Sequence, residues 1–276
     1  MNLIQSWNEF SAKWKKVRRD LSELTVHDLR VATRRLIAEL EIVSAVTQDT
    51  KARGSIREFK KILKRLGDLR DIQVHLLRTG TGNSDLATSF SRLLKQREKE
   101  EIRRLRKWMK KKTKKNLRRR VWRTNQRLKD TLAAISRPVF RAAIEASVRK
   151  RCDAVLTAYA SVRRSSSAEE FHRLRIKLKR FRYAAEVAKP VIGIVTERQI
   201  DRMRKLQKLM GEIHDLQTYM TAFAEWSGAK APVKLQKEYD ARMKAFNDQP
   251  GMFEGFNLRK GVALSRIGSL QRTTRR

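Results

Sequence analysis

Two pairs of matching segments in this 276-residue chain constrain its fold more than any other feature of the sequence. Residues 26–43 read VHDLRVATRRLIAELEIV, and residues 171–188 read FHRLRIKLKRFRYAAEVA. Each is followed by a second matching segment, FKKILKRLGDLRDIQVHLLR at 59–78 and MRKLQKLMGEIHDLQTYMTA at 203–222. Two matches in the same order and at nearly the same spacing indicate an internal duplication, in which each half begins with the same pair of helices.

Apolar residues recur with helical periodicity along the chain. The helices that this period predicts are 24–46, 52–79, 84–132, 138–164, 168–190, 196–227, 230–247 and 254–271. Two predicted helix starts, Thr25 with Asp28 and Ser167 with Glu170, have the spacing of a capping box. No segment alternates persuasively between apolar and polar residues as a strand does, so the predicted fold class is all-α.

The predicted helices fall into two similar sets. We therefore expect two four-helix up-down bundles that are related by the internal duplication. The predicted organisation is an N-terminal helix or arm over 1–20, a first helical half over 21–134, a second helical half over 135–250, and a C-terminal helix with a basic tail over 251–276.

The charge of the chain points to an anionic partner. Lys and Arg total 66 against 29 acidic residues, which gives a net charge of +37. A compact chain with this charge repels itself unless it meets counter-charge, so nucleic acid, an anionic membrane surface and a free polyanion are the candidate partners. The single cysteine, the absence of a signal-peptide pattern and the lack of any apolar stretch near membrane-spanning length predict a cytoplasmic protein without a membrane partner.

One face of the first matching helix carries cations in both copies. On a helical wheel, one side of segment 171–188 holds the polar residues His172, Arg175, Lys179, Arg182, Tyr183 and Glu186. The corresponding face of segment 26–43 holds His27, Arg30, Arg34, Ala38 and Glu41. Because both copies retain a His and two cations at matched positions, we interpret this face as a binding site rather than only a solvated surface.

Such a row of cations suits a linear polyphosphate. Cations three and four residues apart on a helix repel one another, and a chain of phosphates laid across them removes that repulsion and releases counterions. The second helix of each half adds a pair at i,i+4 spacing, Lys60 with Lys64 and Arg204 with Lys208. Asp71 and Asp215 follow these pairs, and we interpret them as clamps for an Arg or His of the row rather than as metal ligands.

The four segments resemble the CHAD family, the conserved histidine α-helical domain. The residues that carry the resemblance are HDLRVATRRL from His27, LGDLRD from Leu66, HRLRIKLKRFRYAAE from His172 and LMGEIHDL from Leu209. The resemblance implies two four-helix bundles related by a pseudo-two-fold axis, with a basic central pore or groove between them. It also implies binding of inorganic polyphosphate and association with polyphosphate granules.

We therefore predict a non-enzymatic polyphosphate-binding protein with no catalytic residue, no cofactor and no metal site. The residues expected to bind polyphosphate are His27, Arg30, Arg34, Arg35, Lys60, Lys64, Arg70, His172, Arg175, Lys179, Arg180, Arg182, Tyr183, Arg204, Lys208 and His214. The alternative is a general binder of the phosphate backbone of RNA or DNA. The dense basic segment 95–129 is either the solvated face of one long helix, an extension of the pore, or a separate nucleic-acid patch.

Overall fold

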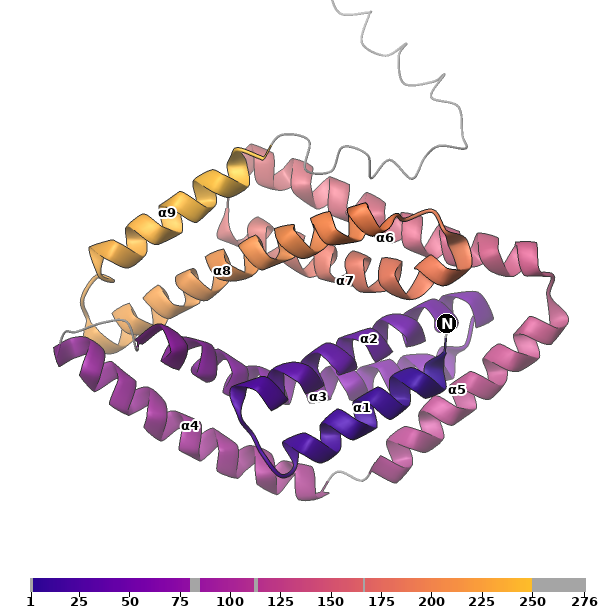
Figure 1. Ribbon diagram of the computed structural model, residues 1–276, viewed down its shortest axis with the longest axis horizontal. Coiled ribbons are helices and arrows are strands. Elements are labelled where there is room, and N and C mark those ends of the chain that lie inside the picture. The colour runs from indigo at the N-terminus through magenta and orange to yellow at the C-terminus, as the bar shows by residue number, and fades with distance from the viewer. Residues whose placement is uncertain (1, 80–84, 112–113, 166, 250–276) are drawn as a thin grey trace, which may run out of the picture.

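Every regular element in the described part of the chain is a helix (Figure 1). The computed structural model describes residues 2–79, 85–111, 114–165 and 167–249. Its helices are α1 (Leu3–Val17), α2 (Glu23–Thr47), α3 (Thr50–Thr79), α4 (Asp85–Lys111), α5 (Lys114–Ala134), α6 (Arg137–Ser165), α7 (Ala168–Ile192), α8 (Glu197–Ser227) and α9 (Val233–Asn247). The predicted all-α class is confirmed for these residues. The helix expected at 254–271 and the basic tail lie outside them.

The single helix predicted over 84–132 is wrong, because the segment contains the two helices α4 and α5. They run in different directions along the lower border of the molecule (Figure 1). Helix α4 packs against α3 and α8, whereas α5 packs against α1, α2 and α3. Phe90 of α4 and Val121 of α5 are both buried, but they face different sets of neighbours. One straight helix could not bury both side chains, although the helical period of apolar residues continues from the segment of α4 into that of α5.

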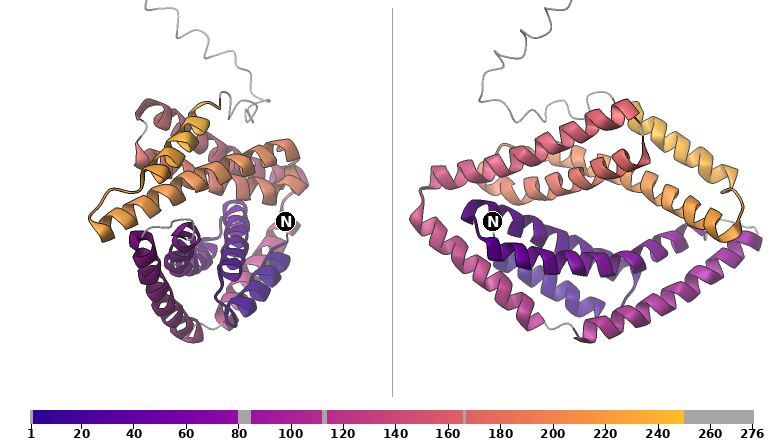
Figure 2. Two further views of the ribbon diagram at one scale, coloured as in Figure 1. Left: turned by 60° about the vertical axis from the view of Figure 1, so that its left-hand side comes forward. Right: turned by 180° about the vertical axis from the view of Figure 1, so that it is seen from behind.

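Each half of the chain has its own apolar core. One cluster joins α1 to α5 and contains Trp14 and Phe59, and the other joins α6 to α9 with Ile42 of α2. The halves meet where α2 packs on α7 and α3 packs on α8. The two further views show the same arrangement, with α2 and α7 in the interior and α4, α5, α6 and α9 along the borders (Figure 2). The first helices of the two matching segments are therefore brought together at the centre of the molecule.

Caps fix the ends of α7 and the start of α8. The Ser167 side chain accepts a hydrogen bond from the backbone N–H of Glu170, as predicted, and Gly193 ends α7 in the left-handed region with φ +64°. Thr196 and Gln199 form a capping box at the start of α8. These caps hold α7 and α8 as an antiparallel pair that presents matched polar faces to α2 and α3.

A glycine inside α8 provides a test of the helix assignment. A Cβ added at Gly211 would meet no atom within 4 Å, so we expect Gly211→Ala to stabilise the protein by about 0.5–1 kcal/mol through helix propensity alone. Urea unfolding measures this effect. Gly193→Ala is the matched control, and it should destabilise the protein because its backbone is left-handed. A loss of stability in Gly211→Ala would contradict the open space around this residue.

Candidate functional site

Four cations from the two matched helices lie close together at the centre of the molecule. Arg30 and Arg34 lie on α2, and Arg175 and Lys179 lie on α7, the helix that packs against it. Burial, followed by the charges of Arg175, Arg34 and Arg30, lowers the pKa of Lys179 to about 6. The two rows that the sequence predicts therefore form one electrostatic cluster.

A groove between α2, α3 and α7 opens beside this cluster. Its cavity has a volume of about 250 Å³. The lining residues, which come from both halves of the chain, are Arg34, Ile37, Ala38, Glu41, Lys60, Leu63, Arg175, Ile176, Lys179, Arg180 and Tyr183. Five cations face this cavity with one carboxylate, so the groove is suited to an anion.

Arg30 is held by the neighbouring helix. Its Nη1 donates a hydrogen bond of 2.9 Å to the Leu63 carbonyl oxygen of α3. Gly67 leaves room for this guanidinium, since a Cβ added there would lie 3.6 Å from Arg30 Nη1. Burial first, and Arg34 second, lower the pKa of Arg30 to about 10. The side chain is therefore positioned in the free protein at an electrostatic cost.

Arg175, at the position matched to Arg30, has a side-chain N–H group that donates no hydrogen bond within the described part of the chain. Its buried Nε has no hydrogen-bond acceptor among the described residues. Burial lowers the pKa of Arg175, while the carboxylate of Asp215 partly opposes this effect. A buried donor without a partner costs about 1–3 kcal/mol. An oxygen of a ligand in the groove would satisfy it.

Three histidines at the row are neutral at physiological pH. The rings of His172 and His214 lie 5.3 Å apart. Burial, followed by the charge of Arg175, lowers the pKa of His214 to about 3. Burial and the nearby cations also lower the pKa of His172 and His27. Each ring can therefore donate through one N–H without adding charge. His75 instead packs edge-on against the ring of Tyr219.

Carboxylates surround the cations in a similar way in both halves. Glu41 pairs with Lys60 at 3.1 Å, and Glu186, at the matched position, pairs with Arg204 at 3.1 Å. Burial raises the pKa of Asp71, and the charge of Arg30 opposes this rise. The acidic side chains near the row thus interact with cations of the row or with cations of the second matching helices.

Several predicted residues lie outside the groove. Arg182 is nearly buried and donates to Gln207 and Glu186 at 2.7 Å each, with its guanidinium 4.1 Å from the centre of the Tyr183 ring. Arg35 lies 4.0 Å from Glu9 of α1. The predicted residues that the structure places elsewhere than on the groove lining are His27, Arg30, Arg35, Lys64, Arg70, His172, Arg182, Arg204, Lys208 and His214. Arg70 pairs with Glu23, and Lys64 and Lys208 are exposed.

Sequence reasoning missed one cation that contacts a groove residue. Arg151 of α6 lies 3.4 Å from Glu41 and shares this carboxylate with Lys60. No pattern in the sequence links α6 to this site, because the contact depends on the packing of α6 against α2. Within the described residues, no helix is long and apolar enough to cross a membrane. The same residues contain no group of three or more His, Cys, Asp or Glu placed to hold a metal ion.

The helical fold matches a known class of domain. The family model described as the CHAD domain matches residues 3–224, so the chain belongs to the CHAD domain family. The crystal structure of the CHAD domain from the plant Ricinus communis superposes with a TM-score of 0.64 at 16% sequence identity, covering 95% of this chain and 90% of that chain. At this identity the likeness establishes the fold alone. A search of curated proteins finds no match.

Proposed function

We propose that this protein binds inorganic polyphosphate in the groove between α2 and α7 and catalyses no reaction. The observation that carries the proposal is the cluster of Arg30, Arg34, Arg175 and Lys179, which comes from both halves and is held partly buried with depressed pKa values at three of its members. Such a cluster of like charges is unfavourable in the free protein, so we infer that an anionic ligand supplies the counter-charge.

A flexible chain of phosphates fits this arrangement better than one compact anion. Along α7, Arg175 and Lys179 are about 6 Å apart on the helix axis, and Arg30 and Arg34 have the same spacing on α2. The groove therefore presents Arg175 and Lys179 of α7 together with Arg34 of α2, and Arg30 lies one turn away on α2. Successive phosphates can contact guanidinium forks and the lysine in turn, with neutral His172 as a further donor.

Internal duplication explains why the cations occur in pairs. The Lys60–Glu41 and Arg204–Glu186 ion pairs occupy matched positions and have the same length, 3.1 Å. The packing of α2 on α7 and of α3 on α8 supports a pseudo-two-fold relation between the halves, because each contact joins a pair of matched helices. We infer that each copy contributes one row and that the groove forms only when both rows face each other.

Binding without reaction is the simpler use of these side chains. Phosphoryl transfer usually depends on carboxylates that hold a metal ion against the phosphates. Here Glu41 and Glu186 pair with Lys60 and Arg204. Asp71 lies in the field of Arg30. The acids of the site are thus committed to cations of the protein.

A triple variant tests the site. We expect Arg34→Gln/Arg175→Gln/Lys179→Gln, called the groove variant, to bind polyphosphate at least about 100-fold more weakly, because it removes several charge-assisted hydrogen bonds. The control variant Arg92→Gln/Arg97→Gln/Lys99→Gln removes the same number of basic side chains from exposed positions of α4, and it should lose only the small non-specific part of the binding. Equal losses in the two variants would mean that net charge alone drives binding.

Competition between polymers tests the ligand. We expect long-chain polyphosphate to displace labelled RNA and DNA at near-physiological salt far more effectively than its charge concentration predicts. Displacement in proportion to charge would favour the alternative function, general binding of nucleic-acid backbones.

A cytoplasmic location on polyphosphate granules follows from the proposal. A fluorescent fusion should mark granules, and the groove variant should not.

A further inference from the structure

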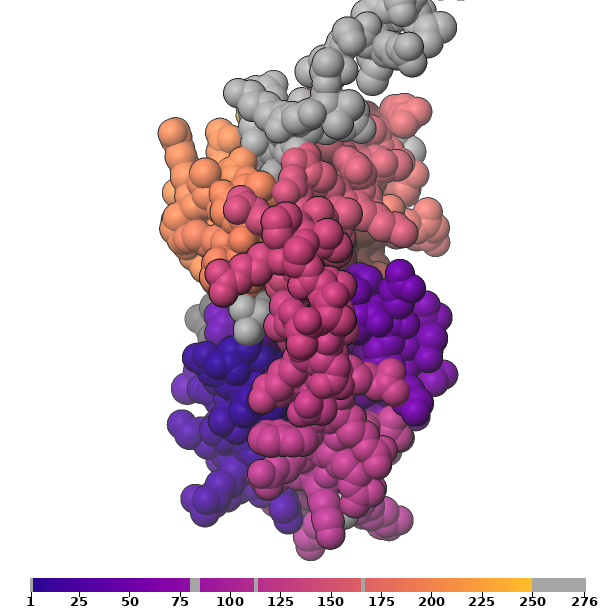
Figure 3. Space-filling view, turned by 90° about the vertical axis from the view of Figure 1, so that its right-hand side faces the viewer, coloured from indigo at the N-terminus to yellow at the C-terminus, as the bar shows by residue number. Residues whose placement is uncertain are grey.

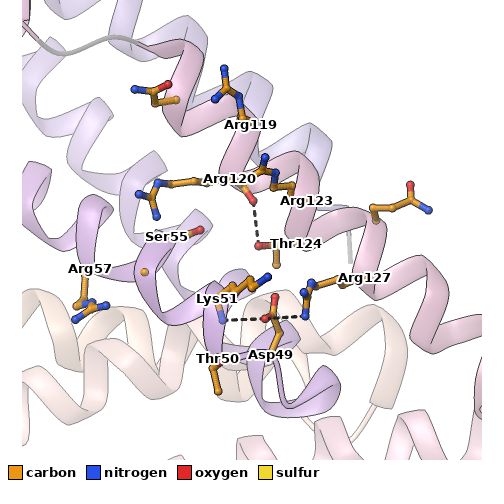
Figure 4. Close-up of a pocket in the computed structure, with 13 residues that line it drawn as sticks. Asp49, Thr50, Lys51, Ser55, Arg57, Arg119, Arg120, Arg123, Thr124 and Arg127 are labelled. Atoms are coloured by element: carbon orange, nitrogen blue, oxygen red, sulfur yellow. Dashed lines mark hydrogen bonds and ion pairs between the residues drawn. The ribbon is translucent and has the colours of Figure 1, made fainter.

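A second basic cleft lies on the outer face of the first half, between the start of α3 and α5 (Figure 4). Its volume is about 800 Å³. The residues that line this outer cleft are Asp49, Thr50, Lys51, Gly54, Ser55, Arg57, Asn116, Arg119, Arg120, Arg123, Thr124, Gln126 and Arg127. The outer cleft and the groove share no lining residue, so they are separate sites.

The charges of the outer cleft are almost entirely positive. Six cationic side chains line it, with one carboxylate. That carboxylate, Asp49, is only 2% exposed and is already satisfied: it accepts 2.8 Å from the backbone N–H of Lys51 and 3.1 Å from Arg127 Nη1. None of the other five cations forms an ion pair with a described residue. The outer cleft therefore holds uncompensated positive charge.

The arginines are arranged by the helix that carries them. Arg119, Arg123 and Arg127 recur every four residues on α5, which places them along about 12 Å of one helix face. Like charges at this spacing repel each other. Figure 3 shows α5 in pink along this face of the molecule, between α1 in indigo and the purple start of α3.

The facing helix completes the outer cleft. Arg120 and Arg127 extend from α5 towards the start of α3 (Figure 4). Gly54 of α3 leaves space for the first of them, since an added Cβ would lie only 3.2 Å from Arg120 Nη1. The first turn of α3, whose Lys51 backbone N–H is already bonded to Asp49, forms the opposite wall. Guanidinium groups of α5 and the first turns of α3 thus border one open volume.

We infer that the outer cleft is a second phosphate site and that it binds a short inorganic oligophosphate. Arginine guanidinium groups recognise phosphate oxygens through two parallel N–H donors. None of the described residues that line the outer cleft is aromatic, so it offers no platform on which a nucleobase could stack. Its ligand is therefore recognised by phosphates alone. The inference does not depend on the function proposed for the groove.

Calorimetric titration with tripolyphosphate tests the inference in the groove variant, in which the central cations have been removed. We expect the groove variant to retain one tripolyphosphate site. Adding Arg120→Gln/Arg123→Gln should weaken this site by at least about tenfold through the loss of two charge-assisted contacts. Adding Arg118→Gln/Lys129→Gln makes the same change of charge on α5 outside the outer cleft and should leave the site within about twofold.

Three results would overturn the inference. The first is that the groove variant binds no tripolyphosphate, which would leave the outer cleft without a ligand of this class. The two added pairs of substitutions could weaken binding equally, which would mean that only net charge matters. A single-stranded oligouridylate could lose more affinity than tripolyphosphate when Arg120 and Arg123 are replaced, which would assign the outer cleft to nucleic acid instead.

A charge-neutral variant separates shape from charge. Gly54→Ala keeps every cation but places a methyl group against the Arg120 guanidinium, which must then move away from α3. Because this side chain is exposed and flexible, the fold should tolerate the change, and alanine improves helix propensity at this position. We expect weaker tripolyphosphate binding with an unchanged dependence on salt. Unchanged affinity would show that the guanidinium position is irrelevant.

Discussion

Lys179→Met is expected to stabilise the free protein while it removes most of the affinity for polyphosphate. Burial and three neighbouring guanidinium groups lower the pKa of Lys179 to about 6. A lysine that must lose its proton or remain charged in such surroundings destabilises the folded state. Methionine has a similar length and no charge, so the gain in unfolding free energy should be roughly 2 kcal/mol.

The same substitution deletes the one lysine that lines the groove on α7. Its loss should therefore weaken polyphosphate binding by at least about tenfold. Urea unfolding and binding titrations on one preparation measure both effects. Lys205→Met is the control, since Lys205 is exposed on α8, and it should change neither quantity appreciably. A destabilised Lys179→Met protein would contradict the view that this lysine is held at a cost to the fold.

Polyphosphate binding is expected to weaken as the pH rises above neutrality, by up to about tenfold per pH unit between pH 7 and 8.5. In the free protein Lys179 has a pKa of about 6, so it is mostly uncharged in this range. A bound polyanion raises that pKa and the lysine takes up a proton. The neighbouring His172, His214 and His27 have lowered pKa values and remain neutral above pH 7.

Calorimetry in two buffers with different ionisation enthalpies measures this proton uptake directly. We expect close to one proton to be taken up per binding site at pH 8. Lys179→Arg should reduce the uptake and flatten the pH profile because an arginine keeps its charge. An unchanged slope in Lys179→Arg would assign the proton to another group. The stability of the free protein should move in the opposite direction: it rises with pH from about 6, because the unfolded chain holds the Lys179 proton to higher pH.

Much of the helical organisation could be predicted because the two pairs of matching segments repeat the same sequence signal. The matched segments fall on α2 with α7 and on α3 with α8. The predicted cap at Ser167 is confirmed. The predicted cap at Thr25 is wrong, since α2 begins earlier, at Glu23, and the Thr25 hydroxyl donates to the Asp20 carbonyl oxygen at 2.7 Å. Short polar residues near a helix start can satisfy several backbone groups, and the chain direction before the helix decides among them.

The interior of the site was harder to predict. A helical wheel divides α7 into a polar side and an apolar side, but α7 packs against α2, α6 and α8 together. Arg182 is consequently buried between helices and hydrogen-bonded to Glu186 and Gln207, although the helical wheel places it in the row of cations. The outer cleft could be predicted only as a dense basic segment, because its shape depends on where α3 meets α5.

One small apolar cluster makes the two halves interdependent. Phe90 and Leu94 belong to α4, in the first half, yet they pack on Tyr219 and Phe223 of α8 in the second half. Either half alone would expose this patch to water and would carry only one row of cations. If the halves descend from one ancestral gene, this shared cluster makes each copy depend on the other for the burial of its apolar residues. Neither copy could then be lost in evolution without exposing apolar surface and dismantling the cationic groove.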